Sequence, residues 1–322
     1  MDGISRRDFL KASTVGAGAL ALEAAAPPAL ARVASGHCGW GAFAEPGPGQ
    51  TPMEAIAAME RLIGRKVDVT RHYMSWDRDF PNAQIRQSGK TGHIPLISWE
   101  AQRRNGTYVK WADIANGRYD TLLKERAREL KSWGHRAYFV FNHEPENDTN
   151  SGNASQFKAA YNHVRHVFDN VGARNLRWVC TLMRGTYSGS HGGAGAWVPS
   201  AAQALGVDGY NRGRCNPDTG WQSFSSIFGP ARNYAKNHNK KLLIQEWGCV
   251  EAGACGGISG SATKAAWIKS AVATIKSWPQ VEAVIYTHAR ANFRGKTFSY
   301  RVDTSASSLT QYRAAGKLAY FS

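Results

Sequence analysis

The sequence predicts an α/β fold, a (β/α)8 TIM barrel that forms a single domain. Short apolar runs alternate with segments of helical periodicity, the pattern of parallel strand–helix units. Eight such runs follow one another along the chain. The first run is not followed by the glycine-rich phosphate turn that an open doubly wound sheet often carries. Because barrels of this kind use roughly 250 residues as one unit, the 322 residues suffice for one barrel and a leader.

The predicted strands are short, and each is followed by a helical or irregular connection. Neighbouring strands should therefore run parallel and close on themselves. They are expected at residues 39–43, 67–73, 93–99, 136–141, 176–182, 207–210, 241–245 and 281–286.

Capping residues, helical periodicity and glycines predict the connecting helices. Thr51 to Glu54 forms a capping box with a proline at the first helical position, and Gly64 ends that helix. The segment 184–199 is rich in Gly, Ser and His and is expected to be a loop. Further helices are expected at 119–133, 155–171, 221–238, from Ser261 to about 278, and at 308–321.

The first 31 residues are expected to be a cleaved export signal. Ser5 to Lys11 fills every position of the twin-arginine pattern, and Ala29-Leu30-Ala31 offers a small-x-small cleavage site. The mature domain then covers 32–322 and lies outside the cytoplasm of a prokaryote, either secreted or in the periplasm. The apolar stretch is too short and too weakly apolar to span a bilayer stably. No later hydrophobic run has the length of a membrane span, so no membrane association is expected.

The chain is strongly basic, with 40 Lys and Arg against 24 Asp and Glu and a net charge of +16. This charge favours adsorption to anionic surfaces such as cell-wall polymers. The cations are scattered and no nucleic-acid-binding motif accompanies them, so nucleic acid is not an expected partner. No Cys and His spacing resembles a zinc site. A monomer without metal or cofactor is expected.

The five cysteines belong to a compartment that permits disulfides. An odd number leaves at least one cysteine unpaired unless chains are bridged. Cys249 and Cys255 flank a glycine-rich loop and are the first expected pair, whereas Cys180 lies within a strand and is expected to be a buried thiol. The pairing of Cys38 and Cys215 stays open.

Two glutamates follow predicted strands on opposite sides of the barrel. Side chains at the carboxyl ends of barrel strands face the active site, and Glu144 and Glu246 end the fourth and seventh strands. Cleavage of a glycosidic bond needs one protonated and one ionised carboxyl group, and a separation of roughly 5–5.5 Å gives retention. Tyr210, at the end of the sixth strand, is expected to reach Glu246 and hold it ionised.

The motifs around these glutamates resemble a known clan. Asn142-His143-Glu144-Pro145 and Gln245-Glu246-Trp247-Gly248 are similar to barrel glycosidases with catalytic glutamates after strands four and seven. The histidine before the first glutamate resembles glycoside hydrolase family 26, best known for β-mannanases. Arg71-His72-Tyr73, Ile97-Ser98-Trp99 and Val207-Asp208-Gly209-Tyr210 extend the resemblance over nearly the whole mature chain.

The resemblance implies a role for each matching residue. Glu144 would be the acid/base, Glu246 the nucleophile of a double displacement, and His143 a neighbour that positions Glu144 or the substrate. Trp99 would line the sugar site. The chain departs from the family after Glu144, where 145–148 replaces Asn and Trp, and at the end of strand eight, where an aromatic residue is expected. Both departures concern the sugar rather than the reaction.

Several further side chains are candidates for substrate binding. An indole ring can cover the apolar face of a pyranose, so tryptophans near the barrel mouth are expected to be sugar platforms, whereas Trp111, Trp133, Trp267 and Trp278 are expected to pack on helices. The binding candidates are Arg71, His72, Trp76, Trp99, His143, Tyr210, Trp247, Tyr286 and His288.

The leading hypothesis is an endo-acting hydrolase of β-1,4-mannan. The same chemistry on another β-glucan, on β-xylan or on an anionic wall polysaccharide is the first alternative. A carbohydrate-binding barrel without catalysis is the second. A metal-dependent deacetylase or esterase lacks support, because no Asp and His ligand cluster or Gly-x-Ser-x-Gly elbow follows a strand.

Overall fold

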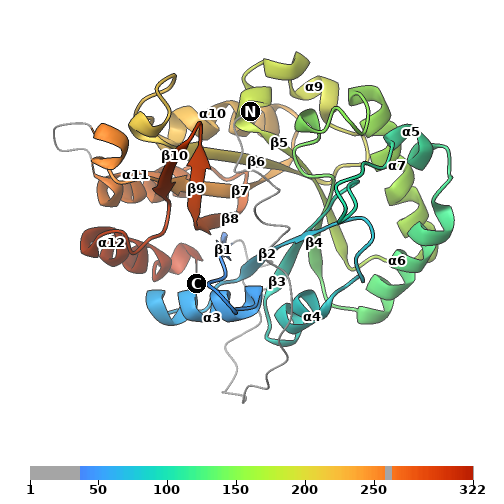
Figure 1. Cartoon of the computed structure of the whole chain (residues 1–322), viewed down its shortest axis with the longest axis horizontal. Coiled ribbons are helices and arrows are strands. Elements are labelled where there is room, and N and C mark those ends of the chain that lie inside the picture. Colours follow the sequence, from blue (N-terminus) through green and yellow to red (C-terminus); the bar gives the residue numbers. More distant parts are fainter. Residues whose placement is uncertain (1–36, 258–262, 322) are drawn as a thin grey trace.

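The computed structural model describes residues 37–257 and 263–321, and in this part of the chain eight parallel strands close into a barrel (Figure 1). Each strand pairs with its neighbours in sequence, and β8 returns to pair with β1. The predicted barrel is therefore confirmed. The strands are β1 (Gly39–Ala44), β2 (Val69–Met74), β3 (Ile94–Trp99), β4 (Ala137–Phe141), β5 (Leu176–Met183), β6 (Ala204–Asn211), β7 (Lys241–Cys249) and β8 (Val281–His288).

Helices surround the barrel on its outside (Figure 1). The α-helices are α3 (Pro52–Ile63), α4 (Ala83–Lys90), α5 (Trp111–Ala115), α6 (Asp120–Trp133), α7 (Ala154–Val171), α8 (Arg184–Tyr187), α9 (Ala194–Trp197), α10 (Phe224–Asn237), α11 (Lys264–Lys276) and α12 (Ala306–Gly316). Short 3-10 turns are η1 (Pro145–Asn147), η2 (Ser190–Gly192), η3 (Gly213–Cys215), η4 (Ala254–Gly256) and η5 (Ala319–Phe321).

The ends of two helices show how well capping residues predicted where a helix begins and ends. The capping box of α3 is present: Thr51 Oγ1 accepts from the Glu54 backbone, and Glu54 Oε2 accepts from the Thr51 backbone. At the other end, Gly64 ends the helix at φ 71°. The helix expected to begin at Ser261 is instead capped by Thr263, whose side chain accepts from the Ala266 backbone. Ser261 itself lies outside the described residues.

The sequence analysis did not predict several short helices and a hairpin. The expected loop 184–199 contains α8, η2 and α9, and α4 and α5 were not predicted. None of these helices exceeds eight residues, which is too short for a clear helical period. A hairpin of β9 (Arg290–Phe293) and β10 (Lys296–Ser299) was also missed. Its two-residue turn places Arg294 and Gly295 at positive φ, as hairpin turns require.

Side chains alternate along each strand between the barrel interior and the layer beneath the helices. The interior is filled mainly by aliphatic residues, including Leu96, Val140 and Leu243. Space is tight there: a Cβ on Gly41 would lie 2.9 Å from both Ile285 and Val69. The outward-facing side chains form two larger clusters rich in aromatic residues.

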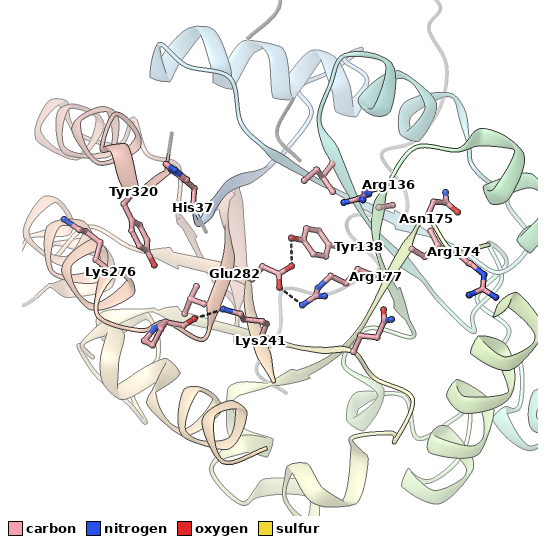
Figure 2. A pocket seen from close by; sticks show the side chains of 16 residues that line it. His37, Arg136, Tyr138, Arg174, Asn175, Arg177, Lys241, Lys276, Glu282 and Tyr320 are labelled. Carbon is pink, nitrogen blue, oxygen red and sulfur yellow. Dashed lines mark hydrogen bonds and ion pairs between the residues drawn. The ribbon is translucent and has the colours of Figure 1, made fainter. Parts of the chain in front are cut away.

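The two ends of the barrel differ in character. The carboxyl ends of the strands carry Glu144 and Glu246, whereas a cavity of about 750 Å³ lies at the amino ends (Figure 2). No helix within 37–257 and 263–321 has the length and apolar character needed to cross a membrane. The predicted boundary of the mature domain at residue 32 lies outside the described residues and stays a prediction.

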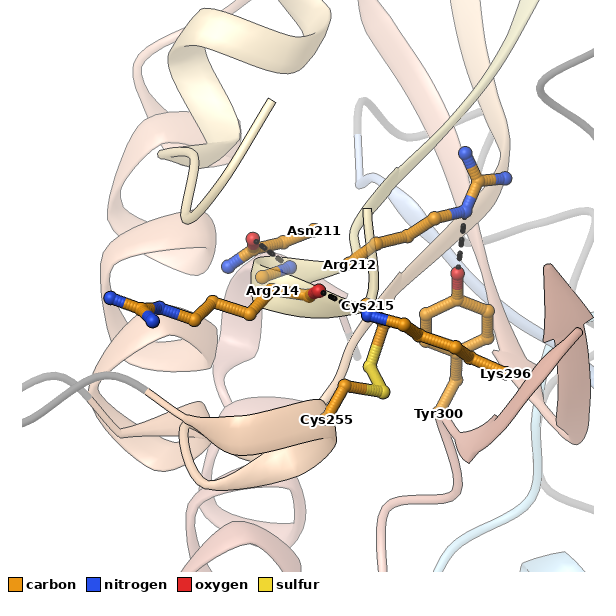
Figure 3. The surroundings of a disulfide bond; sticks show 8 residues. Asn211, Arg212, Arg214, Cys215, Cys255, Lys296 and Tyr300 are labelled. Atoms are coloured by element: carbon orange, nitrogen blue, oxygen red, sulfur yellow. Dashed lines mark hydrogen bonds between the residues drawn. A yellow bond between two sulfur atoms is a disulfide. The ribbon is translucent and has the colours of Figure 1, made fainter. Parts of the chain in front are cut away.

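The disulfide joins Cys215 to Cys255, so the expected pairing of Cys249 with Cys255 is wrong (Figure 3). Cys249 ends β7 with its side chain fully buried, where its Sγ accepts from Asn211 Nδ2 at 3.3 Å. It belongs to a different hydrophobic cluster from the one that contains Cys215 and that Cys255 packs against. The bond connects η3, after β6, with η4, after β7. Cys180 is a buried free thiol, as predicted, and Cys38 and Cys249 are also free and buried.

Removing this disulfide should destabilise the protein. The bond closes a segment of 40 residues, for which chain entropy gives about 4 kcal/mol. We expect a Cys215→Ser/Cys255→Ser variant to lose about that much in urea unfolding and to become insensitive to reductant. Peptide mapping of the oxidised protein serves as the control, because a Cys249–Cys255 peptide would contradict the structure.

Candidate active site

A bulge in β7 turns two consecutive side chains toward the barrel interior. Val207 of β6 pairs with Ile244, but the next residue, Asp208, pairs with Glu246, so Gln245 is the extra residue. Such a bulge interrupts the alternation of a strand. Gln245 accepts from Thr181 Oγ1 at 2.9 Å inside the barrel, and Glu246 faces the tyrosines at its carboxyl end.

Both carboxylate oxygens of Glu246 are held by donors from other strands. Tyr73 of β2 donates a hydrogen bond to Oε1, and Tyr210 of β6 donates to Oε2 at 2.5 Å. The guanidinium of Arg71 lies 3.2 Å from Oε1. Tyr210 thus reaches Glu246 as predicted. Tyr73 was missing from the candidates, although its place two residues after Arg71 on one face of β2 was a usable signal.

Arg71 is a fully buried cation at the centre of this cluster. Its Nη1 donates to Gln245 Oε1 at 2.8 Å and its Nε donates to the Tyr73 hydroxyl at 2.5 Å. Burial by itself lowers the pKa of Arg71. The opposing effects of Tyr73, Glu246 and Asp208 together are larger, so the net pKa is raised and the charge is kept. A buried charge is stable only when paired, which makes Arg71 and Glu246 dependent on each other.

His143 and Asp208 form a buried hydrogen-bonded pair beside Glu246. His143 Nε2 contacts an Asp208 carboxylate oxygen and lies 3.5 Å from Glu246 Oε1. The pKa of Asp208 is raised well above its usual range, first by burial and then by the negative charge of Glu246, with Glu144 adding a smaller effect. Both glutamates are therefore within electrostatic reach of Asp208.

Glu144 follows β4 in a left-handed backbone conformation. Its φ is 46°, and that of Asn142 is 51°, an unfavourable geometry for residues other than glycine that clusters at functional sites. The Asn142 side chain holds the turn: Oδ1 accepts from the Ala101 backbone at 3.0 Å and Nδ2 donates to Asp148 at 2.7 Å. Asn147 Nδ2 donates to Glu144 Oε2 at 3.2 Å.

The unusual residues after Glu144 have a structural role. Pro145 begins η1, and Glu146 Oε1 accepts from the Met183 backbone and from Thr186 Oγ1, both at 2.7 Å. These contacts tie the loop after β4 to the end of β5. The sequence analysis identified residues 145–148 as a departure from the family pattern but did not predict that they connect the loop after β4 to the end of β5.

The ring of Tyr210 packs against a second tyrosine, Tyr300. The Tyr300 ring stacks on it with centroids 4.4 Å apart. Arg212 Nε donates to the Tyr300 hydroxyl at 3.1 Å (Figure 3). Thr287 of β8 lies 3.1 Å from the Tyr210 hydroxyl. The strand alternation that turns Thr287 inward turns His288 outward, where its Nδ1 accepts from the Val302 backbone. His288 is therefore not placed to bind substrate beside Glu246, contrary to expectation.

The prediction that Trp76, Trp99 and Trp247 are sugar platforms is wrong, because their indole rings are buried. Trp76 and Trp99 stack on each other at 4.4 Å and are 2% and 0% exposed. Trp99 occupies the outward position next to the inward Ser98. Trp247, 0% exposed, packs against Trp267 at 6.0 Å.

Two further candidates also belong to the outer layer. Tyr286 is fully buried and contacts Trp247 at 4.9 Å, and its hydroxyl donates to the Tyr300 backbone at 2.7 Å. His72 lies between Arg71 and Tyr73 on β2 but points to the opposite side, where Nε2 is 2.9 Å from Thr70 Oγ1. Neither residue takes part in the candidate site. The packing roles expected of Trp111 and Trp267 agree with their burial.

Three side chains in the described part of the chain have the spacing of a metal site. One potential ligand atom each of His143, Glu144 and Asp208 lies within 4.8 Å of the others. His143 and Asp208 already bond to each other, so an ion that used these same atoms would have to replace that bond. The expectation that no metal is bound stays a prediction.

The fold and the site together define a class: a parallel (β/α)8 barrel with carboxylates at the ends of β4 and β7. Solved structures of glycoside hydrolases are similar to this fold in shape. A GH26 β-mannanase from Bacteroides ovatus has 12% identity and a TM-score of 0.58, with 91% of this chain and 92% of that chain covered. The GH26 endo-β-1,4-mannanase domain of Bacillus sp. JAMB-750 has 14% identity, a TM-score of 0.55 and coverage of 88% and 86%.

Sequence comparison finds one related protein and an export signal. Endoglucanase H from Acetivibrio thermocellus is 28% identical over 289 residues, which cover 83% of this chain and 29% of the relative. The chain thus spans less than a third of that relative. Residues 3–22 match the TAT (twin-arginine translocation) pathway signal sequence family. The signal indicates export from the cytoplasm, to the periplasm or the exterior, as predicted.

The contributions of Arg71 and Glu246 to the free energy of unfolding should be coupled. We expect Arg71→Met to lower the free energy of unfolding by about 3 kcal/mol, because it leaves a buried carboxylate without its cation. In a Glu246→Gln background the same change should cost at least ~1 kcal/mol less. Urea unfolding of the four proteins measures this coupling. The exposed pair Arg118 and Asp113 is the control and should show almost none; strict additivity for Arg71 and Glu246 would contradict the placement.

His72 should make stability depend on pH. Burial, and next the nearby His93, lower its pKa from 6.5 to about 3. As pH falls from 6.5 toward 3, the unfolded chain takes up a proton that the folded chain refuses, so stability is lost. The stability advantage of wild type over His72→Gln should shrink by about 3 kcal/mol between pH 7 and 4. Parallel stability curves for the wild type and His72→Gln between pH 7 and 4 would disprove the assignment.

Proposed function

We propose that the chain is an exported retaining glycoside hydrolase that cleaves a β-linked polysaccharide by double displacement. The observation that carries this proposal is the environment of Glu246: two tyrosine hydroxyls and the Arg71 guanidinium surround its carboxylate. Partners on both carboxylate oxygens hold the side chain in one orientation, which a nucleophile needs. The barrel fold and the similarity to an endoglucanase and to mannanases support the same class.

In the proposed reaction Glu246 attacks the anomeric carbon while Glu144 donates its proton to the leaving glycosidic oxygen. The bond from the anomeric carbon to that oxygen breaks, and a glycosyl ester on Glu246 forms. In the second step Glu144 removes a proton from water, whose oxygen attacks the anomeric carbon and frees Glu246. The configuration at the anomeric carbon is retained.

The surrounding residues are proposed to position Glu246 rather than to exchange protons with substrate. Tyr73 and Tyr210 fix its two oxygens, and Arg71 provides a cation that remains charged throughout. The His143–Asp208 pair lies beside Glu246 and limits its rotation. Groups held by packing and hydrogen bonds cost no reorganisation during reaction.

The proposed substrate is a β-1,4-linked polysaccharide, with mannan as the first candidate. The shape of the barrel resembles that of GH26 mannanases. A β-glucan is the second candidate, because the relative in sequence is an endoglucanase and its identity is higher than that of those mannanases. The burial of Trp76, Trp99 and Trp247 leaves sugar stacking to other side chains, so these tryptophans do not discriminate between the two.

Release of reducing sugar from a panel of polysaccharides tests the proposal. Galactomannan, glucomannan, mixed-linkage β-glucan, β-1,3-xylan and an anionic wall polymer form the panel. We expect hydrolysis of mannan or β-glucan, with Glu144→Gln slower by 10² to 10⁴-fold, on the order of general acid–base contributions, and Glu246→Gln inactive. A folded protein that binds one polymer but hydrolyses none would instead establish a binding barrel.

Azide rescue separates the roles of the two glutamates. In Glu246→Gly, azide fills the space of the missing nucleophile and should yield a glycosyl azide of inverted configuration from an activated substrate. In Glu144→Gly, azide should intercept the glycosyl-enzyme and yield the retained configuration. Proton NMR distinguishes the two products. The opposite pattern would exchange the assignments, and inversion by the wild type would disprove the double displacement.

A further inference from the structure

The amino-terminal end of the barrel contains a cavity that takes no part in the proposed reaction. Its lining includes the first residues of several strands: Ile94 of β3, Ala137 of β4, Leu176 of β5, Lys241 of β7 and Val281 of β8 (Figure 2). The catalytic candidates follow the opposite ends of the strands. The cavity, of about 750 Å³, is thus on the far side of the barrel from Glu144 and Glu246.

Cations dominate this cavity. Among the described residues that line it, Glu282 is the only carboxylate, against five cationic side chains: Arg136, Arg174, Arg177, Lys241 and Lys276. Glu282 is already satisfied, since Tyr138 donates to Oε1 at 2.8 Å and Arg177 donates to Oε2 at 2.6 Å (Figure 2). One cation is therefore neutralised and the others are not.

Three of the remaining cations are exposed and free to meet a ligand. Arg136, Arg174 and Lys276 are all exposed, and no carboxylate in the described part of the chain forms a salt bridge with them. Lys241 Nζ donates to the Pro279 carbonyl at 2.9 Å, which leaves its charge uncompensated. Like charges gathered around a concave surface reinforce one another and attract anions.

We propose that this basic cavity binds an anionic polymer of the cell envelope that carries phosphodiester groups. Arginine guanidinium groups match the geometry of phosphate oxygens, and three or more neighbouring cations favour a chain of repeated charges over a single ion. The twin-arginine signal takes the protein out of the cytoplasm, to a location where wall polymers are more abundant than nucleic acid. The polymer would hold the barrel by its amino-terminal end and leave the carboxyl end free.

Binding of the exported protein to fluorescently labelled poly(glycerol phosphate) tests this proposal. The test variant is Arg136→Gln/Arg174→Gln/Lys276→Gln. The matched control, Lys124→Gln/Arg128→Gln/Lys269→Gln, removes the same charge from exposed positions on α6 and α11. At about fivefold per cation near an anionic surface, the test variant should bind roughly a hundredfold more weakly, and added salt should weaken the wild type toward it.

The outcomes distinguish binding at this cavity from nonspecific attraction to the basic protein surface. Equal weakening of the test and control variants, or no weakening, would overturn the proposal. Tighter binding of polygalacturonate or of single-stranded DNA than of poly(glycerol phosphate) would overturn the choice of polymer. Unchanged urea unfolding checks that the variants are folded, and Arg174→Gln/Lys276→Gln replaces the triple variant if it is not. Because the assay needs no hydrolysis, its result is independent of the proposed enzymatic function.

Discussion

The buried charge of Arg71 is the constraint on which the carboxyl end of the barrel depends. A guanidinium with no access to water must be surrounded by acceptors and anions. Here these are Gln245 and Glu246 on β7 and Tyr73 on its own strand. The cation in turn makes it possible to bury Glu246. Neither residue would be stable at this depth without the other, so the position of the proposed nucleophile is fixed by charge as much as by the strand.

The bulge in β7 makes this pairing geometrically possible. In a regular strand Gln245 and Glu246 would point to opposite sides, and one of them would be in the aromatic layer beneath the helices. The register shift beside Asp208 lets both side chains face inward. Gln245 then connects Arg71 with Thr181 of β5, and Glu246 is left to the tyrosines. Gln245 and Thr181 inside the barrel are therefore linked through Arg71 to the candidate site.

The sequence predicted the elements whose signal is local. The apolar strands, the capping box of α3 and the strand-end positions of Glu144 and Glu246 all depend on residues close together in the chain. The inward or outward direction of a strand-end side chain depends on register and bulges, and this is why Trp99, Trp247, His72 and His288 were assigned to the wrong side. The partner of Cys255 was missed because Cys215 is 40 residues away, and distance in sequence gave no reason to prefer it.

The bond between Cys215 and Cys255 gives the protein two covalent forms that depend on location. Cytoplasmic thiols are kept reduced, so a chain that has not yet crossed the membrane carries five thiols. After export the segments that follow β6 and β7, the strands of Tyr210 and Glu246, are crosslinked. Protein recovered from the cytoplasm of an expression host is therefore a different chemical species from the exported one, and its loops at this end are held only by noncovalent contacts.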